Sequence, residues 1–391
     1  MLACQKHLFS LPADLHYLNC AYHGPLLRRV EQAGIEGIRQ KANPAAIQPE
    51  DFFRDSDTVR GLFARLVNAP DPIRIAIIPA VSYGMAVVAR NTSVRPGQNL
   101  VLAHEQFPSN VYPWRALARE HGAEVRTVSA PEGAERRAEA WNARILEAIA
   151  GDTALVSVAH VHWADGTCFD LEAIGARARE VGAALVIDGT QSVGALPFDI
   201  ERIRPDALVV TGYKWLLGPY GMGLAYFGPR YDGGVPLEEN WIGRLGSEDF
   251  AGLTRYRVEY QPGALRYDVG ERSNPILLPM LIAALEQVLA WGPEHIQAYC
   301  AHLTAGFTEQ AREMGFAVQE TGRASHLFGL RPPAGLGMDR IRAVLDAHRV
   351  AVSFRGDVLR VSPNVYNDEA DIAALLEALH ASASRAARVS A

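Results

Sequence analysis

Short apolar runs alternate with segments of helical composition over the first part of the chain. Most of the runs are apolar on both sides of the period-two alternation, which is typical of strands buried on both faces of a parallel sheet. With helices between them, they give the β-α-β order of a doubly wound α/β domain. The strands are predicted at 73–78, 99–103, 123–128, 154–159, 183–187, 207–210 and 223–227. The helices are predicted at 83–90, 113–121, 134–150 and 170–181.

The pattern changes after Asn274. A long amphipathic segment, 279–291, and a helix over 293–314 are followed by short strands with one further helix among them. These elements predict an α+β domain of about a hundred residues, which is a usual domain size. The strands are expected at 316–319, 326–330, 350–354 and 358–361, and the helix at 338–348.

Length and composition favour more than one domain. The chain has 391 residues, of which 49% are hydrophobic, so it can bury a large core. We expect an N-terminal segment, 1–16, that packs near the small domain. A large α/β domain, 17–274, is expected to hold a mainly parallel seven-stranded sheet, and 275–391 to form the small α+β domain.

Charge and cysteine usage narrow the classes of partner and the compartment. The net charge of −6 comes from 38 basic and 44 acidic residues spread along the chain, a pattern without a basic patch for nucleic acid or an anionic membrane. No apolar run reaches membrane-spanning length, and the first residues do not resemble a signal peptide. The four cysteines are widely separated, as suits free thiols. We expect a cytoplasmic protein that binds neither nucleic acid nor membrane.

Two apolar runs are followed by side chains that suit a covalent cofactor site. Asp188 ends the first run, and Lys214 follows the next one 26 positions later. A lysine amine acts as a nucleophile only when its pKa is lowered, and the apolar residues 215–217 favour burial of Lys214. Pyridoxal phosphate acts as an electron sink while its pyridine nitrogen stays protonated, which a carboxylate such as Asp188 ensures. Taken singly, Asp188 is equally a turn former and Lys214 a solvated surface lysine.

The whole segment 185–223, LVIDGTQSVGALPFDIERIRPDALVVTGYKWLLGPYGMG, resembles the cofactor segment of the class V aminotransferase family. This family of fold-type I enzymes includes cysteine desulfurases, selenocysteine lyases, kynureninases and isopenicillin N epimerase. Weaker similarity extends from about Tyr17 to Tyr366. The resemblance implies the fold, the cofactor pyridoxal 5'-phosphate, a Schiff base on Lys214, and Asp188 as the partner of the cofactor ring.

The cofactor phosphate is expected at the start of the helix after strand 73–78. A helix N-terminus offers free N–H groups and the positive end of a dipole. In the resembled family this turn cradles the phosphate, which assigns Val81 and Ser82, although Ser82 is equally suited to cap the helix. Thr211 and Tyr213 flank the lysine and offer two further hydroxyl groups.

The resemblance also implies contacts to the cofactor ring. Family members place an aromatic or imidazole ring on its face, and Phe107 aligns with that residue; a core position for Phe107 is the alternative. Trp163 stands where desulfurases carry an asparagine near the phenolic oxygen of the cofactor. Gln191 is therefore the expected partner of that oxygen.

His160 and His162 form an HxH pair that directs both rings to one face of a strand. Such a pair could belong to a metal site, but no third ligand stands at a recognisable spacing. We therefore predict no metal.

A homodimer follows from the segment 239–243. It resembles a kynureninase segment whose tryptophan, here Trp241, donates its indole N–H to the phosphate of the neighbouring subunit. The desulfurase phosphate loop carries a threonine where this chain has Glu271, and a glutamate is poorly suited to contact phosphate. We expect an active site at the subunit interface.

An amino-acid substrate needs donors for its carboxylate, and the fork of an arginine has the matching geometry. Arg360 aligns with the carboxylate-binding arginine of the family. Arg355 is a second candidate or a solvated loop residue. The segment 17–25, which contains Asn19, matches the family motif whose backbone lines the substrate pocket.

The reaction type stays open. Scaffold-type desulfurases need a cysteine in the loop before the carboxylate arginine, and the loop 353–357 has none. We favour a class V aminotransferase or C–S/C–Se lyase-like enzyme in which the released Lys214 moves the α-proton. A kynureninase-like hydrolase and an amino-acid epimerase are the alternatives. From other classes, an inactive cofactor-binding protein and an unrelated nucleotide-binding enzyme were considered.

Overall fold

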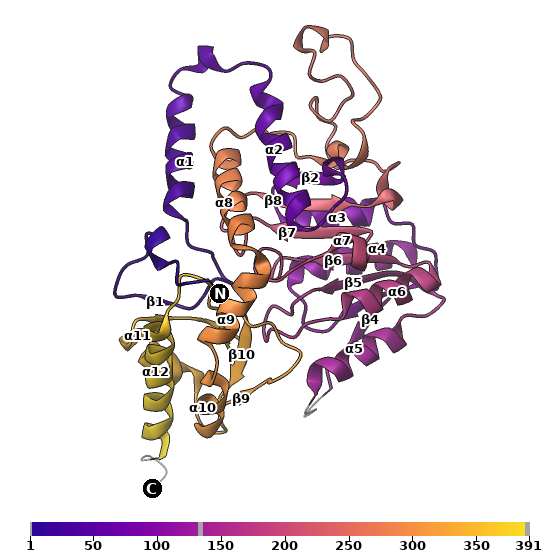
Figure 1. Cartoon of the computed structure of the whole chain (residues 1–391). Helices are drawn as coiled ribbons and strands as arrows, with labels where there is room; N and C mark the ends of the chain where they lie inside the picture. The colour runs from indigo at the N-terminus through magenta and orange to yellow at the C-terminus, as the bar shows by residue number, and fades with distance from the viewer. Residues whose placement is uncertain (1, 132–135, 388–391) are drawn as a thin grey trace.

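The computed structural model describes residues 2–131 and 136–387 (Figure 1). Its largest sheet has seven strands, namely β2 (Ile75–Ile78), β3 (Asn99–Ala103), β4 (Glu124–Val128), β5 (Thr153–Ala159), β6 (Ala184–Asp188), β7 (Ala207–Thr211) and β8 (Gly223–Phe227). Their order is β2-β8-β7-β6-β5-β3-β4. Only β8 runs antiparallel to its neighbours, β2 and β7, among these described strands. The predicted mainly parallel α/β sheet is confirmed.

The large sheet is covered on both faces (Figure 1). In β6, Leu185 and Ile187 enter one hydrophobic cluster, whereas Val186 enters a second cluster on the opposite face. The first cluster packs against α2 (Asp51–Leu66), α5 (Arg137–Ala148), α6 (Leu171–Val181) and α8 (Leu277–Trp291). The second packs against α3 (Val81–Arg90) and α4 (Tyr112–His121). Burial of both faces explains why the strands are nearly continuous apolar runs.

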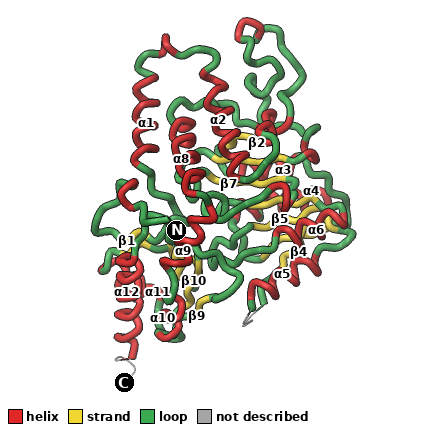
Figure 2. The backbone as a smooth tube through the Cα atoms, viewed as in Figure 1, coloured by secondary structure: helices red, strands yellow, loops and turns green. Residues whose placement is uncertain are grey.

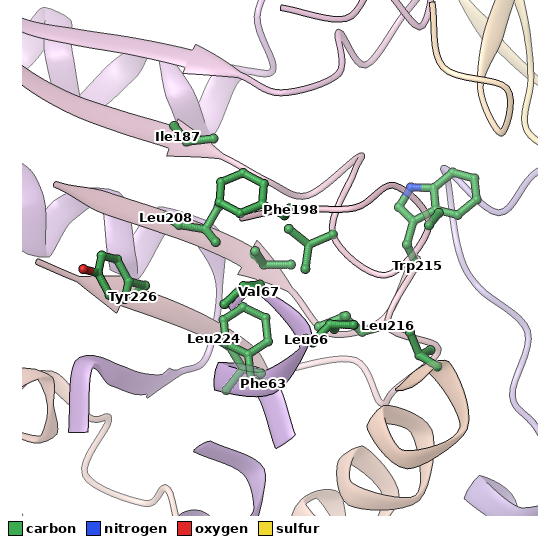
Figure 3. Close-up of a cluster of buried hydrophobic side chains, with 14 of the residues drawn as sticks. Phe63, Leu66, Val67, Ile187, Phe198, Leu208, Trp215, Leu216, Leu224 and Tyr226 are labelled. Atoms are coloured by element: carbon green, nitrogen blue, oxygen red, sulfur yellow. The ribbon is translucent and has the colours of Figure 1, made fainter. Parts of the chain in front are cut away.

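The turn after β7 is anchored in the first cluster. Figure 3 shows Phe63 of α2 and Leu224 of β8 in this cluster together with Trp215 and Leu216. Trp215 and Leu216 directly follow Lys214 in the sequence and are fully buried. Their packing fixes the backbone from which the lysine side chain projects.

A second, antiparallel sheet is formed by the C-terminal part of the chain. Its order is β12-β13-β10-β9, with β9 (Ala317–Val318), β10 (Phe328–Arg331), β12 (Ser353–Arg355) and β13 (Val358–Val361). A separate parallel pair joins β1 (His16–Tyr17) to β11 (Val350–Ala351). The surrounding helices are α9 (Pro293–Leu303), α10 (Phe307–Glu313), α11 (Met338–Ala347) and α12 (Glu369–Ala387), and a short helix α7 (Ile200–Ile203) precedes β7.

Two elements that were predicted as single units are each divided into two in the structure. The helix predicted over 293–314 is interrupted between α9 and α10, where Gly306 has a φ of 75°. Glycine reaches this left-handed conformation without steric cost, and it cannot continue a right-handed helix. The strand predicted over 350–354 is divided into β11 and β12, which pair with different partners.

The helix α1 (Arg28–Gln40) was not anticipated from the apolar pattern. Its buried positions are Val30, Gly34 and Gly37, and two of these have no side chain. A Cβ atom at Gly37 would lie 2.3 Å from the carbonyl oxygen of Pro275, so the backbones approach closely there. The contact between α1 and the α8 region thus depends on glycines, which carry no hydrophobic signal.

The segment between β8 and α8 is mostly irregular and extends away from the large sheet as a long loop (Figure 2). A short 3-10 turn, Phe250–Gly252, interrupts it. The bridge between Arg244 and Tyr260 joins its two arms. This loop carries Trp241.

The division into 1–16, 17–274 and 275–391 stays a prediction. Residue 1, residues 388–391 and the first two residues of the predicted helix 134–150 lie outside the described residues. Close to the N-terminus, Lys6 Nζ lies 2.9 Å from the carboxylate of Asp368, at the start of α12.

Within the described ranges, no helix has the length and apolarity needed to cross a membrane.

Candidate active site

A cavity of about 310 Å³ opens at the carboxyl ends of β5, β6 and β7. Ala159, Asp188 and Thr211, the last residues of these strands, all line it. This is the edge at which open α/β sheets bind ligands. The predicted site residues that line the cavity are Val81, Ser82, Phe107, Asp188, Gln191, Thr211, Tyr213 and Lys214.

Lys214 is a buried amine facing aromatic rings. Its side chain is almost inaccessible, and Nζ lies 5.6 Å from the ring centroids of both Phe107 and Tyr213. Burial, followed by the positive charge of Arg360, lowers the pKa of Lys214 to about 8, although Asp188 acts in the opposite direction. The solvated-lysine alternative is therefore wrong, because the structure gives the amine the depressed pKa that a nucleophile requires.

The pH at which Lys214 becomes reactive follows from this shift. A lysine with a lowered pKa holds a neutral amine above that pKa, so half of Lys214 is neutral near pH 8. In cofactor-free protein, acylation of Lys214 by an amine-reactive ester, followed by peptide mass spectrometry, is expected to reach half its maximal rate near pH 8. Arg360→Gln is expected to move this midpoint upward, because it removes a cation that disfavours the charged amine. A midpoint near pH 10.4, the value of an unperturbed lysine, would contradict the buried setting.

Asp188 ends β6 with a buried carboxylate. Its Oδ1 accepts a hydrogen bond from the backbone N–H of Thr190 at 3.0 Å. Burial raises the pKa of Asp188, and the backbone hydrogen bond from Thr190 and the charge of Lys214 oppose that rise. A buried carboxylate of this kind is stabilised by a cationic group placed against it, as a protonated ring nitrogen would be.

The N-terminus of α3 faces the same cavity, and Val81 and Ser82 line it. The residue before the helix, Ala80, provides no side-chain cap, and Ser82 is the second helical residue, so the alternative of Ser82 as the N-cap is wrong. The helix packs closely on the sheet, because a Cβ atom at Gly84 would lie 2.7 Å from Val209 Cγ1. The first-turn N–H groups therefore suit a phosphate.

Phe107 presents an exposed ring to the cavity. Its side chain is 42% exposed, which rules out the alternative of a core phenylalanine. Its ring meets that of Trp163 edge-on, with centroids 5.5 Å apart. The loop that carries it is fixed by buried amides, since Gln106 Nε2 donates to the Ser157 carbonyl and Asn110 Nδ2 donates to Gln106 Oε1, both at 2.8 Å.

Gln191 lines the cavity, and its side-chain amide makes two hydrogen bonds within the protein. Its Nε2 donates to the carbonyl oxygen of Ala21 at 3.1 Å, and its Oε1 accepts from Trp215 Nε1 at 2.8 Å. An amide nitrogen carries two hydrogens, so one remains for a further acceptor. Its predicted contact with the phenolic oxygen stays a prediction.

Arg360 and Asn19 lie behind the cavity wall and do not line it. Arg360 Nη1 donates to the Trp163 carbonyl at 2.9 Å, and its Nη2 donates to Ser353 Oγ at 3.3 Å. Ser353 Oγ in turn donates to Asn19 Oδ1. Asn19 thus contacts the predicted carboxylate-binding arginine through one hydroxyl group.

Trp241 is not brought to the cavity within one chain. It packs edge-on against Phe52, Phe53 and Phe250 and is 37% exposed. Its predicted contact with the phosphate of a neighbouring subunit stays a prediction.

His160 and His162 have separate surroundings. His160 packs edge-on against Phe198, and burial lowers its pKa to about 4. His162 Nδ1 lies 3.1 Å from Asp165 Oδ1, and its Nε2 lies 3.1 Å from the Glu105 carbonyl oxygen. A search of the described residues finds no group of three or more His, Cys, Asp or Glu side chains that could hold a metal ion.

Two aromatic residues of the cavity had no role assigned from the sequence. Trp163 lines it and holds its indole N–H against the Glu105 carbonyl at 2.6 Å. Tyr220 lines it from the glycine-rich turn after the lysine, with its ring centroid 4.6 Å from that of Tyr213. The sequence signal available for Tyr220 was its distance of six residues from Lys214 in that turn.

The cavity suits a phosphorylated aromatic aldehyde. Four groups line it: the buried amine of Lys214, the buried carboxylate of Asp188, the exposed ring of Phe107 and the uncapped helix N-terminus at Val81. Thr190 adds a buried hydroxyl without a hydrogen-bond partner among the described residues. The residues present therefore fit pyridoxal phosphate.

Comparisons with known proteins agree with this geometry. The family model for aminotransferase class V matches residues 48–320. Isopenicillin N epimerase from Streptomyces clavuligerus is 28% identical over 382 residues, which cover 93% of this chain and 94% of that protein. A cysteine desulfurase from Pectobacterium atrosepticum is 28% identical over 253 residues, covering 62% of this chain and 58% of that protein.

Solved structures show the same fold. The cysteine desulfurase of Thermococcus onnurineus has a TM-score of 0.85 at 18% identity, covering 98% of this chain and 99% of that chain. A variant of the enzyme C-DES with glycine covalently linked to its PLP cofactor also has a TM-score of 0.85, at 21% identity, covering 96% and 98% of the two chains.

Proposed function

This chain belongs to the class V aminotransferase family, a family of fold-type I enzymes that use pyridoxal 5'-phosphate, and we propose that its reaction on an amino acid proceeds through Lys214. One observation carries this proposal. The Lys214 amine is buried at the carboxyl edge of the sheet, in one cavity with Asp188 and Phe107. A lysine in that setting is a nucleophile and a base near neutral pH.

The residues that would hold the cofactor follow from the cavity. The first turn of α3, with Val81 and Ser82, and the hydroxyl groups of Thr211 and Tyr213 would hold the phosphate. Phe107 would contact the ring, and the remaining amide hydrogen of Gln191 would be available to the phenolic oxygen. Asp188 would keep the ring nitrogen protonated. When bound, the cofactor accepts the electron pair released by cleavage of a bond at the α-carbon.

The protein side chains then supply binding and proton transfer. Arg360 holds the substrate α-carboxylate, and its own position is set by the Trp163 carbonyl and by Ser353, which Asn19 supports. Lys214 removes the α-proton, because its lowered pKa leaves a useful fraction of neutral amine at pH 7.

A persulfide-forming desulfurase is disfavoured. The hairpin between β12 and β13 contains no cysteine in its turn, Gly356–Asp357. Cys20, whose Sγ lies 3.8 Å from the Lys214 carbonyl oxygen, is buried, and this raises its pKa to about 11, so it is not a thiolate at neutral pH. The proposal therefore centres on α-proton chemistry, in an aminotransferase or lyase-like enzyme.

Epimerisation of an amino acid is the second candidate. It is supported by the similarity to isopenicillin N epimerase, which spans 94% of that protein. An epimerase and a transaminase share the first proton transfer and differ in where the proton returns.

Quaternary state and compartment complete the proposal. We place the active site at the interface of a homodimer, in which the exposed Trp241 reaches the phosphate of a neighbouring subunit. The four cysteines are free, which supports a reducing compartment such as the cytoplasm.

Exchange of the substrate α-proton tests the proposed function. The purified holoenzyme is incubated with a panel of L-amino acids in heavy water and followed by proton NMR. At least one amino acid is expected to lose its α-proton signal, whatever the final product. The product, an oxo acid, a D-amino acid or a cleaved side chain, then assigns the reaction. If no amino acid exchanges its α-proton, the proposed function is wrong.

A further inference from the structure

Arg355 lies on the same face of a hairpin as Arg360. In the antiparallel pair β12–β13, Ser353 is opposite Arg360 and Arg355 is opposite Val358. Side chains alternate between faces along a strand, and directly opposite residues share a face. Arg355, two positions after Ser353, is thus a diagonal neighbour of Arg360, at roughly 7–8 Å.

Both guanidinium groups are held against Trp163. The guanidinium carbon of Arg355 lies 5.4 Å from the Trp163 ring centroid, and that of Arg360 lies 6.0 Å from it. The Trp163 ring lines the lysine cavity and is fixed by its hydrogen bond to the Glu105 carbonyl. Two cations therefore lie against Trp163, which lines the cavity, although neither arginine lines the cavity itself.

Neither arginine is neutralised by an acid in the part of the chain that the structure describes. Arg360 donates to the Trp163 carbonyl and to Ser353, and Arg355 donates to the Phe354 carbonyl at 2.7 Å. The Nε atoms of both arginines are buried without a hydrogen-bond partner among these residues. The nearby Asp357 pairs with Arg331 instead, at 3.3 Å.

Two neighbouring positive charges without a counter-ion favour anionic ligands. Burial, and then the charge of Arg355, lower the pKa of Arg360, because neighbouring like charges disfavour each other. The α-carboxylate of an amino acid neutralises one of them. A second anionic group on the same substrate would neutralise the other, with the directional hydrogen bonds that guanidinium groups form.

We infer that Arg355 forms a second anion subsite beside Arg360, so that the substrate is an amino acid whose side chain bears a carboxylate or another anionic group. This inference rests on the proposed function, because it takes the α-carboxylate to be held by Arg360. Arg355 then determines whether the enzyme prefers acidic or neutral amino acids.

Amino acids paired with their own amides test the subsite. L-aspartate is compared with L-asparagine and L-glutamate with L-glutamine, since each pair differs in charge and hardly in shape. Dissociation constants come from the change in cofactor absorbance of the holoenzyme, and KM and kcat from α-proton exchange. In at least one pair the acid is expected to bind roughly 10–100-fold more tightly than its amide, the usual range for a charged hydrogen bond.

Substitutions of Arg355 test whether this side chain causes the preference for acids over amides. Arg355→Gln is expected to bring the acid-to-amide ratio close to one through a rise in the dissociation constant and KM of the acid. Arg355→Lys is expected to keep part of the preference. Arg342→Gln is the matched control, because Arg342 stacks on Phe354, 4.4 Å from its ring centroid, and is expected to leave the ratio unchanged.

The outcomes separate the subsite from the proposed function. If acids and amides bind and exchange equally well in the unaltered enzyme, or if the preference survives in Arg355→Gln, the subsite is wrong and the proposed function stands. If no amino acid of either kind changes the cofactor absorbance or exchanges its α-proton, both are wrong.

Discussion

Replacement of Lys214 by alanine is expected to lower the rate of substrate α-proton exchange by about 10²–10⁴-fold, the usual contribution of a positioned acid–base group. Among the residues that the structure describes, no other lysine lines the cavity, and the printed sequence contains only two more, Lys6 and Lys41. Exchange in heavy water, followed by proton NMR, measures this loss.

Two controls make the Lys214 result specific. Lys41→Ala, at an exposed position near the end of α1, is expected to leave the exchange rate unchanged. Added methylamine is expected to restore part of the rate in Lys214→Ala, because a small amine fits the space left by the lysine side chain. A Lys214→Ala protein that keeps more than about a tenth of the original rate would refute the role of this amine as the base.

Replacement of Asp188 by asparagine is expected to have the second largest effect. Asparagine keeps the shape and can accept the hydrogen bond from the Thr190 N–H, but it removes the negative charge that we propose faces the ring nitrogen of the cofactor. We expect exchange to slow by about 10²–10³-fold, as when one preorganised electrostatic contact is removed from an active site. Proton NMR of the exchange and the cofactor absorbance of the same samples check this result.

The melting temperature of the cofactor-free protein distinguishes an electronic role of Asp188 from a structural role. Its folded pKa is raised, so its ionised form destabilises the cofactor-free protein at pH values above its unfolded pKa. Asp188→Asn is therefore expected to leave the melting temperature of the cofactor-free protein unchanged or higher at pH 7. A large fall in that temperature, parallel to the loss of activity, would show that Asp188 mainly maintains the fold.

The sequence predicted the large sheet well, because the apolar pattern that indicates a buried strand lies within the strand itself. Most strands are runs that are apolar on both faces, with the polar edge strand β4 as the exception, and the runs of β6 and β7 end where Asp188 and Thr211 reach the cavity. Neither α1 nor α2 was predicted, although α2 buries Val59, Phe63 and Leu66 at helical spacing, whereas the contact of α1 with the α8 region uses Gly34 and Gly37. Hydrophobic periodicity cannot register a contact made by residues without side chains.

The candidate site was predictable where one segment supplies it. Asp188, Gln191 and Lys214 lie in one stretch of the chain, so the pairing of Asp188 with Lys214 and the resemblance of the whole stretch to the family together indicated the chemistry. Trp163 and Arg355 belong to segments almost two hundred positions apart, and only the fold places them in contact. The orientation of Arg355 depends on the register of a two-strand hairpin, which the sequence does not specify by itself.

The position of the covalent link tests the central claim most directly. The holoenzyme is treated with sodium borohydride, digested, and analysed by mass spectrometry for the peptide that carries the phosphopyridoxyl group. The chain offers three lysines, of which Lys6 is paired with Asp368 and Asp371. We predict that the label lies on Lys214 alone. A label on Lys6 or Lys41, or no label on any peptide, would contradict the account.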